Sequence, residues 1–223
     1  VGSEMCIRDR GTPTLFIDGE WCASSDGGRR PTYNPYDASV IMHVDEATSN
    51  DARRAIAAAK AFFSSSDWSR RSYQDRCELL NRMADSLQKN KAELARIETI
   101  DTGKTLGESE IDIDDVTNVF RFYAKEALKL AEDKRVTGPL VPESVKSLVV
   151  HEPVGVCVLI TPWNYPILQL CWKLAPALAT GNVVIVKPSE VTPLSTIYLV
   201  HMMLEVGFPS GLSLIHISEP TRL

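Results

Sequence analysis

One asparagine stands where a side-chain amide could assist catalysis. Asn164 lies between Pro162 and Pro166, directly after an apolar run at residues 154–160 that is typical of a buried strand. An amide held there could donate a hydrogen bond to an oxygen that becomes negative when a nucleophile attacks a carbonyl. Asparagine also bonds to its own turn in many loops, so the local pattern leaves two interpretations of Asn164 open.

A lysine and a glutamate follow a second apolar run, at residues 183–186. Lys187 and Glu190 leave this run where an ammonium and a carboxylate could both reach the hydroxyls of a ribose. Ligands of open α/β sheets bind outside the carboxyl ends of the strands, which makes this segment a candidate binding loop. Either residue alone would be interpreted as a solvated side chain in a surface turn.

The elements that must position these side chains predict an α/β fold. Strand, helix, strand and helix alternate over residues 154–206 with continuous β-branched strands, which is typical of a parallel sheet covered on both faces. The expected fold class is α/β, with an incomplete Rossmann-type parallel sheet preceded by an N-terminal helical segment. The other expected elements are a hairpin around residues 18–19, a loop at 32–35, and helical periodicity at 50–63, from 72 to 102 and at 108–132.

Two linked motifs around these side chains closely resemble the aldehyde dehydrogenase superfamily. The first joins TPWNYP at residues 161–166 to WKLAPALATGN at 172–182, and the second is VKPSE at 186–190. The resemblance runs from about residue 15 to about residue 211. It implies an aldehyde dehydrogenase-like fold and the NAD-dependent oxidation of an aldehyde to a carboxylic acid.

The resemblance implies a role for each residue of these motifs. It assigns the oxyanion contact to Asn164 and a charge-relay role to Lys173, although a lysine on a helix is usually just solvated. It places Lys187 and Glu190 at the adenosine ribose of NAD. A carboxylate there would repel a 2′-phosphate, so NAD is expected in preference to NADP. The other implied cofactor contacts are Ile160, Thr161, Pro162, Trp163, Pro188 and Ser189.

Two acidic and two aromatic residues suggest a cationic substrate. Asp112 and Asp115 are three residues apart on an expected helix, so their carboxylates share a face and could receive a cation. Tyr165 and Trp172 could add aromatic faces, which attract a quaternary ammonium. Residues 98–116 resemble the betaine-aldehyde and aminoaldehyde dehydrogenase branch, in which these four positions line the entrance to the site. Negative charge near a helix start and ordinary aromatic packing explain the same residues, so both interpretations stay open.

A monovalent cation, potassium or sodium, is a further cofactor that the resemblance implies. Asp101, together with main-chain groups of Thr32, Tyr33 and Val191, matches such a site in similar enzymes. A plain carboxylate at a helix end explains Asp101 at least as well.

The composition favours a soluble protein. Of 223 residues, 44% are hydrophobic and 24% are charged, and the formal net charge is −5, which argues against nucleic acid and anionic membranes as partners. No apolar run has the length of a membrane span and the start lacks a secretory pattern, so a cytoplasmic protein is expected. An organellar address stays open, because both ends of the chain resemble foreign sequence.

The chain is expected to divide into five segments. Residues 1–10 and 213–223 resemble translated sequencing adapters and are expected to be non-native. Residues 11–140 are the predicted N-terminal helical part of an NAD-binding domain, residues 141–153 the strands of an oligomerisation arm, and residues 154–212 the first, truncated βαβα unit of the NAD-binding core. By resemblance, the complete protein is expected to be a homodimer or a homotetramer.

The cysteines of this chain do not match the sequence context of the family's nucleophile. The reaction needs a thiolate that attacks the aldehyde and a carboxylate base, and in the family both lie downstream of the matched segments. The chain by itself is therefore expected to be inactive. Two hypotheses stay open: a truncated portion of an active NAD-dependent enzyme, or a short non-catalytic relative that binds nucleotide or pairs with a full-length subunit. A reductase of acyl phosphates with the same fold is a third, which the motif at residues 162–164 disfavours.

Overall fold

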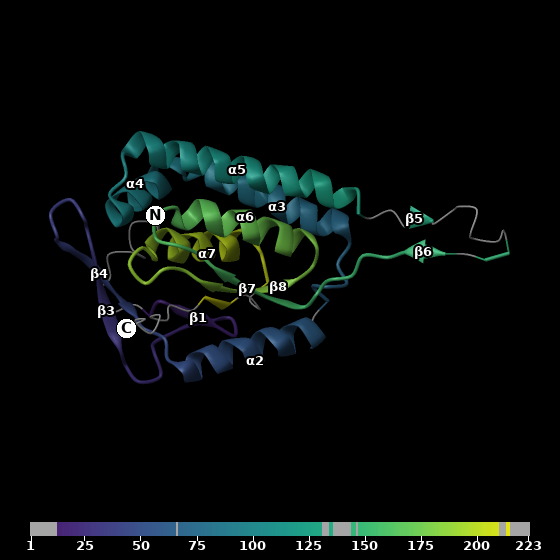
Figure 1. Ribbon diagram of the computed structural model, residues 1–223, viewed down its shortest axis with the longest axis horizontal. Helices are drawn as coiled ribbons and strands as arrows, with labels where there is room; N and C mark the ends of the chain where they lie inside the picture. The colour runs from purple at the N-terminus through teal and green to yellow at the C-terminus, as the bar shows by residue number, and fades with distance from the viewer. Residues whose placement is uncertain are drawn as a thin grey trace.

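A five-stranded sheet forms the centre of the molecule. The computed structural model describes residues 13–65, 67–130, 134–135, 144–145, 147–209 and 213–214. The strands of the sheet are β1 (Leu15–Ile17), β2 (Glu20–Cys22), β7 (Val156–Ile160), β8 (Val183–Lys187) and β9 (Ser213–Leu214), and their order is β2-β1-β9-β8-β7. Helix α2 (Ser49–Ser65) lies on one side of this sheet, and α6 (Pro166–Ala179) and α7 (Leu194–Val206) lie on the other (Figure 1).

Three of the five strands run parallel to each other. The register of β7 and β8 extends from Val156 opposite Val183 to Ile160 opposite Lys187, and β9 pairs in parallel with β8. The antiparallel partner of β9 is β1. This arrangement confirms the mixed α/β class, with a small sheet.

The two predicted apolar strands differ in how well they are covered. Strand β8 is buried from residue 183 to residue 186, as its continuous apolar sequence predicts. Strand β7 lies at the edge of the described sheet, and its Val158 and Ile160 are more than half exposed while Leu159 between them is buried. The expectation of a sheet covered on both faces is therefore correct for β8 and wrong for β7, because the described elements leave the face of β7 that carries Val158 and Ile160 largely uncovered.

Helices α6 and α7 begin and end where the sequence provides the signals. Pro166 occupies the first turn of α6, where a missing main-chain N–H leaves no hydrogen bond unmade. Helix α7 ends at Gly207, whose φ of 99° belongs to the left-handed region that glycine adopts without strain. Both helices are strongly apolar, because they lie between the sheet and a second layer of helices.

The outer layer contains α3 (Tyr73–Lys89), α4 (Lys91–Thr102) and α5 (Leu106–Leu128), of which α5 packs against α3 and α6. Ser72 caps α3 by accepting a hydrogen bond from the main-chain N of Asp75 at 3.0 Å. Thr105 and Glu108 form a capping box at the start of α5. Helical structure is confirmed over most of the predicted ranges, but the stretch from 72 to 102 is divided at Asn90 into α3 and α4. Helix α5 begins two residues earlier than expected, because Thr105 is its cap, and ends at Leu128.

The N-terminal part agrees with the expectation at the hairpin and differs from it at Thr32 and Tyr33. The hairpin is confirmed, with Asp18 and Gly19 both at positive φ between β1 and β2. Thr32 and Tyr33, expected in a loop, belong to strand β3 (Arg29–Tyr33), which pairs with β4 (Val40–Asp45). The prediction there is wrong because β3 contains a proline, which is tolerated in a separate two-stranded sheet but obscures a strand pattern. The cap of α2 is Thr48, whose Oγ1 accepts hydrogen bonds from the N–H groups of residues 50 and 51.

A third, two-stranded sheet extends away from the body of the molecule (Figure 1). It pairs β5 (Lys134–Arg135) with β6 (Leu148–Val149) in antiparallel register. The rest of the expected segment at 141–153 is only partly described, and most of the expected foreign segments lie outside the described residues. The role of this arm in assembly therefore stays a prediction.

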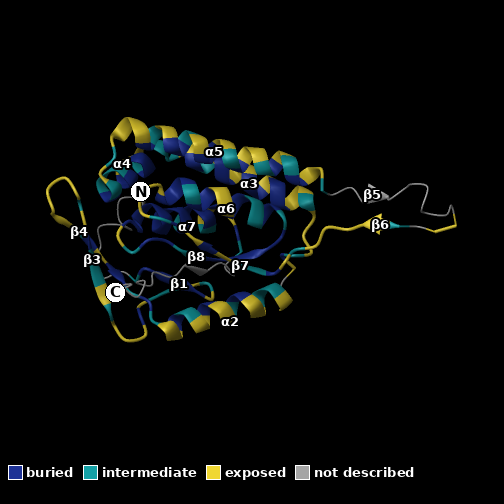
Figure 2. Cartoon of the chain, in the orientation of Figure 1, coloured by how far each residue is buried: buried dark blue, intermediate teal, exposed yellow. Residues whose placement is uncertain are grey.

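The hydrophobic core lies between the sheet and the two helical layers. Its largest fully buried side chains include Phe16, Phe120, Leu80 and Leu174, from four different elements. The outward faces of α2 and α5 are exposed, whereas α6 and α7 are largely buried (Figure 2). Among the described residues, no helix combines the length and the apolar character needed to cross a membrane.

Candidate functional site

The two predicted binding loops lie side by side at the carboxyl edge of the parallel strands. Ile160 and Lys187 are partners at the ends of β7 and β8, and the N–H of Thr161 donates to the carbonyl of Lys187 at 3.1 Å. The hydroxyl of Thr192 donates to the carbonyl of Trp163 at 3.0 Å and so ties the second loop to the first. The loops at residues 161–166 and 186–190, which are 20 residues apart in the sequence, therefore meet in the structure. The rule that ligands bind at the carboxyl ends of parallel strands predicts this arrangement.

The predicted cofactor residues form a buried base with partly exposed side chains above it. Thr161, Pro188 and Ser189 are buried, and the hydroxyl of Thr161 has no hydrogen-bond partner in the described part of the chain. Lys187 and Glu190 are partly exposed, and the remaining contacts are the half-buried Pro162 and the exposed Ile160 and Trp163. An ammonium and a carboxylate on a strand end match the hydroxyls of a ribose, so the donor set fits a dinucleotide.

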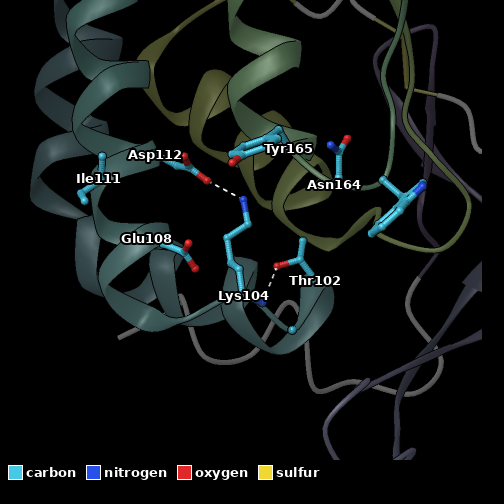
Figure 3. Close-up of a pocket in the computed structure, with 9 residues that line it drawn as sticks. Thr102, Lys104, Glu108, Ile111, Asp112, Asn164 and Tyr165 are labelled. Carbon is cyan, nitrogen blue, oxygen red and sulfur yellow. Dashed lines mark hydrogen bonds and ion pairs between the residues drawn. The ribbon is translucent and has the colours of Figure 1, made fainter.

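Asn164 lies in a cavity of about 400 Å³ beside this edge. The cavity is bounded by the turn that precedes α6 and by the corner between α4 and α5 (Figure 3). The Asn164 side chain is exposed and makes no hydrogen bond to any described residue. In this structure its amide does not bond to its own turn, and both of its N–H groups can donate to a ligand.

A lysine occupies the acidic and aromatic part of the same cavity. Nζ of Lys104 lies 2.5 Å from Oδ2 of Asp112, 3.7 Å from Oε1 of Glu98 and 4.2 Å from the ring centroid of Tyr165. Burial raises the pKa of Glu98, and the side chain of Ser195 and then the charge of Lys104 lower it again in part. The sequence motifs give no role to Lys104. The signal that could have found it is its position between Glu98 and Asp112 in the sequence, directly after the glycine that ends α4.

The four residues predicted to receive a cationic substrate divide between two cavities. Asp112 is buried and lines the cavity of Asn164 together with Tyr165. Asp115 is exposed and lines a second cavity of about 270 Å³, which it shares with Trp172 and Phe122. Three residues of spacing put the two acids on neighbouring positions of α5, but Lys104, from the corner between α4 and α5, pairs only with the first.

Lys173 is not part of either cavity. Its exposed side chain extends from α6, and Nζ donates a hydrogen bond to the main-chain carbonyl of Ile160. This contact holds the end of β7, where the cofactor is expected. A relay role for Lys173 stays a prediction.

The four residues of the predicted cation site line one cavity of about 510 Å³, which Trp163 and Glu190 also line. Asp101 is buried there, and its Oδ2 accepts a hydrogen bond from the N–H of Leu194 at 2.8 Å, while Oδ1 has no partner among the described residues. Burial raises the pKa of Asp101 well above its ordinary value, and the charge of Glu98 adds to this. The arrangement brings Asp101 together with Thr32, Tyr33 and Val191, as predicted.

The described cysteines lack the character of nucleophiles. Burial raises the pKa of the thiol of Cys22, Cys77, Cys157 and Cys171, which favours the protonated form. Cys6 lies outside the described residues. No group of three or more His, Cys, Asp or Glu side chains within the described ranges is arranged to hold a metal ion.

Comparison with known proteins identifies relatives along most of the chain. The model of the aldehyde dehydrogenase family matches residues 21–219. Betaine aldehyde dehydrogenase of Bacillus subtilis (strain 168) is 44% identical over 200 residues, which are 90% of this chain and 40% of that protein. Retinaldehyde dehydrogenase 3 of Mus musculus is 41% identical over 201 residues, 88% of this chain and 38% of that protein.

A solved structure agrees with this relationship. The crystal structure of betaine aldehyde dehydrogenase from Staphylococcus aureus in complex with NAD+ superposes with a TM-score of 0.87 at 44% identity, over 93% of this chain and 41% of that one. The chain thus spans about two fifths of the length of the relatives that it matches.

Proposed function

The chain belongs to the aldehyde dehydrogenase family, and from this premise we propose that the complete protein oxidises an aldehyde to a carboxylic acid with NAD. In this proposal the described residues supply the cofactor edge and one donor for the reacting oxygen. The observation that supports it most strongly is the unpartnered amide of Asn164, exposed in a cavity beside the ends of β7 and β8.

The proposed contribution of Asn164 is to stabilise negative charge. Attack of a nucleophile on the aldehyde carbon moves charge onto the carbonyl oxygen, and a fixed N–H donor favours that charged state over the neutral aldehyde. The four described thiols are not the nucleophile in this proposal, since burial raises the pKa of each. When bound, NAD supplies the acceptor for the hydride.

NAD is the proposed cofactor because of the side chains at the end of β8. We propose that this edge is the start of a Rossmann-type sheet, where Lys187 and Glu190 contact the ribose of the cofactor. A carboxylate at Glu190 disfavours the additional phosphate of NADP by charge repulsion. The Staphylococcus aureus relative was solved in complex with NAD+, which supports the same cofactor here.

The proposed substrate class is a cationic aldehyde such as betaine aldehyde or an aminoaldehyde. The cavity of Asp115, Trp172 and Phe122 joins an exposed carboxylate to two exposed aromatic side chains, which is the chemistry that binds a quaternary ammonium. Because this cavity is separate from that of Asn164, its proposed role is to attract the cationic aldehyde at the entrance to the site. The Bacillus subtilis relative, a betaine aldehyde dehydrogenase, supports this class. A retinaldehyde dehydrogenase is nearly as similar, so the identity alone does not choose between a cationic and an apolar aldehyde.

A monovalent cation beside Asp101 completes the proposal. The unpartnered Oδ1 of this buried carboxylate would be a ligand for potassium or sodium. The expected effect is on stability, measured as a higher midpoint of unfolding in potassium chloride than in the chloride of a bulky organic cation at equal ionic strength.

The experiment that tests the function uses the complete protein. NADH formation is followed with betaine aldehyde, an aminoaldehyde and a simple neutral aldehyde, each with NAD and with NADP. We expect turnover with NAD and a smaller kcat/KM with NADP. In Glu190→Gln the ratio of kcat/KM with NAD to kcat/KM with NADP should become smaller. Absence of turnover with every aldehyde, while NAD still binds, would contradict the oxidation and favour a non-catalytic relative.

A further inference from the structure

Lys104 connects three elements that meet around Asn164. Its main chain lies in the corner between α4 and α5, directly after Gly103, whose φ of 80° ends α4. Its side chain is only 12% exposed and extends along the cavity toward Asp112, beside the ring of Tyr165 (Figure 3). The contacts therefore join the end of α4, the first turns of α5 and the turn that begins α6.

The charges around Lys104 make its position specific. Glu98 and Asp112 are both buried, and the Lys104 ammonium forms an ion pair with each. Burial raises the pKa of Glu98, and the Ser195 side chain, the Lys104 charge and the Ile167 main chain each lower it in part. Lys104 is thus the cation among the groups that compensate this buried carboxylate, with Nζ 3.7 Å from Oε1. A buried carboxylate that loses its cation is strongly disfavoured, which holds the ammonium between the two acids.

The ring of Tyr165 links this charge cluster to the asparagine. Tyr165 directly follows Asn164, occupies the cap position of α6 and makes no capping hydrogen bond with its side chain. An ammonium 4.2 Å from the ring centroid attracts the ring face. On its other side the same turn is held by the hydrogen bond from Thr192 to the carbonyl of Trp163. The turn of Asn164 is thus fixed from the sheet side by Thr192 and from the helical side by Lys104.

We propose that Lys104 is a positioning residue for Asn164: it holds the Tyr165 ring against the α4–α5 corner and thereby fixes the direction in which the Asn164 amide donates. The catalytic consequence of this inference rests on the proposed function, whereas its structural consequence does not. A small displacement of a donor reduces the stabilisation of a transition state much more than the binding of the substrate.

The structural consequence is tested first, without any aldehyde. The side-chain amide of Asn164 is observed by NMR in the complete protein after isotope labelling of asparagine, in the wild type, in Lys104→Met and in Lys104→Arg. Methionine keeps the length of the side chain and removes its charge, while arginine keeps the charge. We expect the Asn164 amide resonance to shift and broaden in Lys104→Met and to stay near its wild-type position in Lys104→Arg. An unchanged resonance in folded Lys104→Met would overturn the proposal.

The catalytic consequence is tested by a double-mutant cycle. Lys104→Met is expected to lower kcat about 10- to 100-fold with little change in KM, and Lys104→Arg to retain most of the activity. In the Asn164→Ala background, Lys104→Met should lower kcat by less than about twofold, because the donor that it positions is already absent. Independent, multiplicative effects of the two substitutions would contradict the proposal.

A second variant keeps the test decisive if Lys104→Met does not fold. Tyr165→Leu removes the ring and leaves Lys104 paired with its two acids. It should displace the Asn164 amide resonance as Lys104→Met would, and a wild-type resonance in this variant would refute the linkage. If the wild-type protein oxidises no aldehyde, the proposed function fails, while the NMR comparison still decides whether Lys104 orders Asn164.

Discussion

Asp112 and Asp115 stand one helical turn apart on the same helix, and each lies beside an aromatic residue, yet their surroundings are opposite. Asp112 is buried and paired with Lys104 under the ring of Tyr165. Asp115 is exposed in a cavity with Trp172. The first combination of an acid and an aromatic ring already holds a cation that belongs to the protein, and the second is open to one from solution. The same residue types therefore serve structure in one place and can serve binding in the other.

The largest expected effect concerns the stability that the buried ion pairs of Lys104 provide. Lys104→Met leaves two buried carboxylates without their cation and should lower the free energy of unfolding by about 3–5 kcal/mol. The matched control is Lys91→Met, which breaks the more exposed ion pair between Lys91 and Asp114 and should cost about 0–1 kcal/mol. Urea unfolding of both variants measures the contrast. An equal decrease in the free energy of unfolding in both variants would contradict the prediction that burial of Asp112 and Glu98 makes the Lys104 ion pairs more important for stability.

The second difference concerns substrate choice. Asp115→Asn should lower kcat/KM for betaine aldehyde roughly tenfold, because it removes the charge that attracts the quaternary ammonium at the entrance, an effect of roughly 1.4 kcal/mol. The neutral isostere 3,3-dimethylbutanal should be oxidised as before. Asp112→Asn is the internal control and should leave the ratio of the two substrates unchanged. A change of this ratio in Asp112→Asn but not in Asp115→Asn would reverse the assignment.

The smallest expected effect is on the pH dependence of stability. Burial raises the pKa of Glu98, so the folded protein keeps a proton that the unfolded chain has released. Between the ordinary carboxyl pKa and the raised one, stability therefore falls as the pH rises. Glu98→Gln should therefore reduce the loss of stability with rising pH. Part of that loss should remain, because burial also raises the pKa of Asp101. The measurement is the unfolding midpoint of the wild type and of Glu98→Gln at several acidic pH values. The same change of midpoint with pH in both proteins would contradict this prediction.

Much of the fold follows from local signals in the sequence. The apolar runs before Thr161 and Lys187 and the turn at Asp18 and Gly19 each predict an element that the structure contains. The edge where the two loops meet also follows, because parallel strands end on the same side of a sheet. Strand β3 does not follow, since a short segment with a proline resembles a loop.

The site is predictable only in part, because its electrostatics depend on tertiary distances. Periodicity places Asp112 and Asp115 on one helix, but it does not reveal that Lys104, from the preceding corner, pairs with the first of them. The unpartnered amide of Asn164 likewise depends on the path of its turn. Spacing along α5 predicts that Asp112 and Asp115 are neighbours. It does not predict their counter-ions, because the lysine that pairs with Asp112 comes from the corner between α4 and α5.

The most direct test of the proposed function is the kcat of Asn164→Ala in the complete protein with NAD and its best aldehyde. We expect a loss of about 10²- to 10³-fold in kcat, with the KM for the aldehyde and the Kd for NAD nearly unchanged, because the amide acts on charge that develops only during the reaction. A variant with wild-type kcat would contradict the assignment of Asn164 to the reacting oxygen.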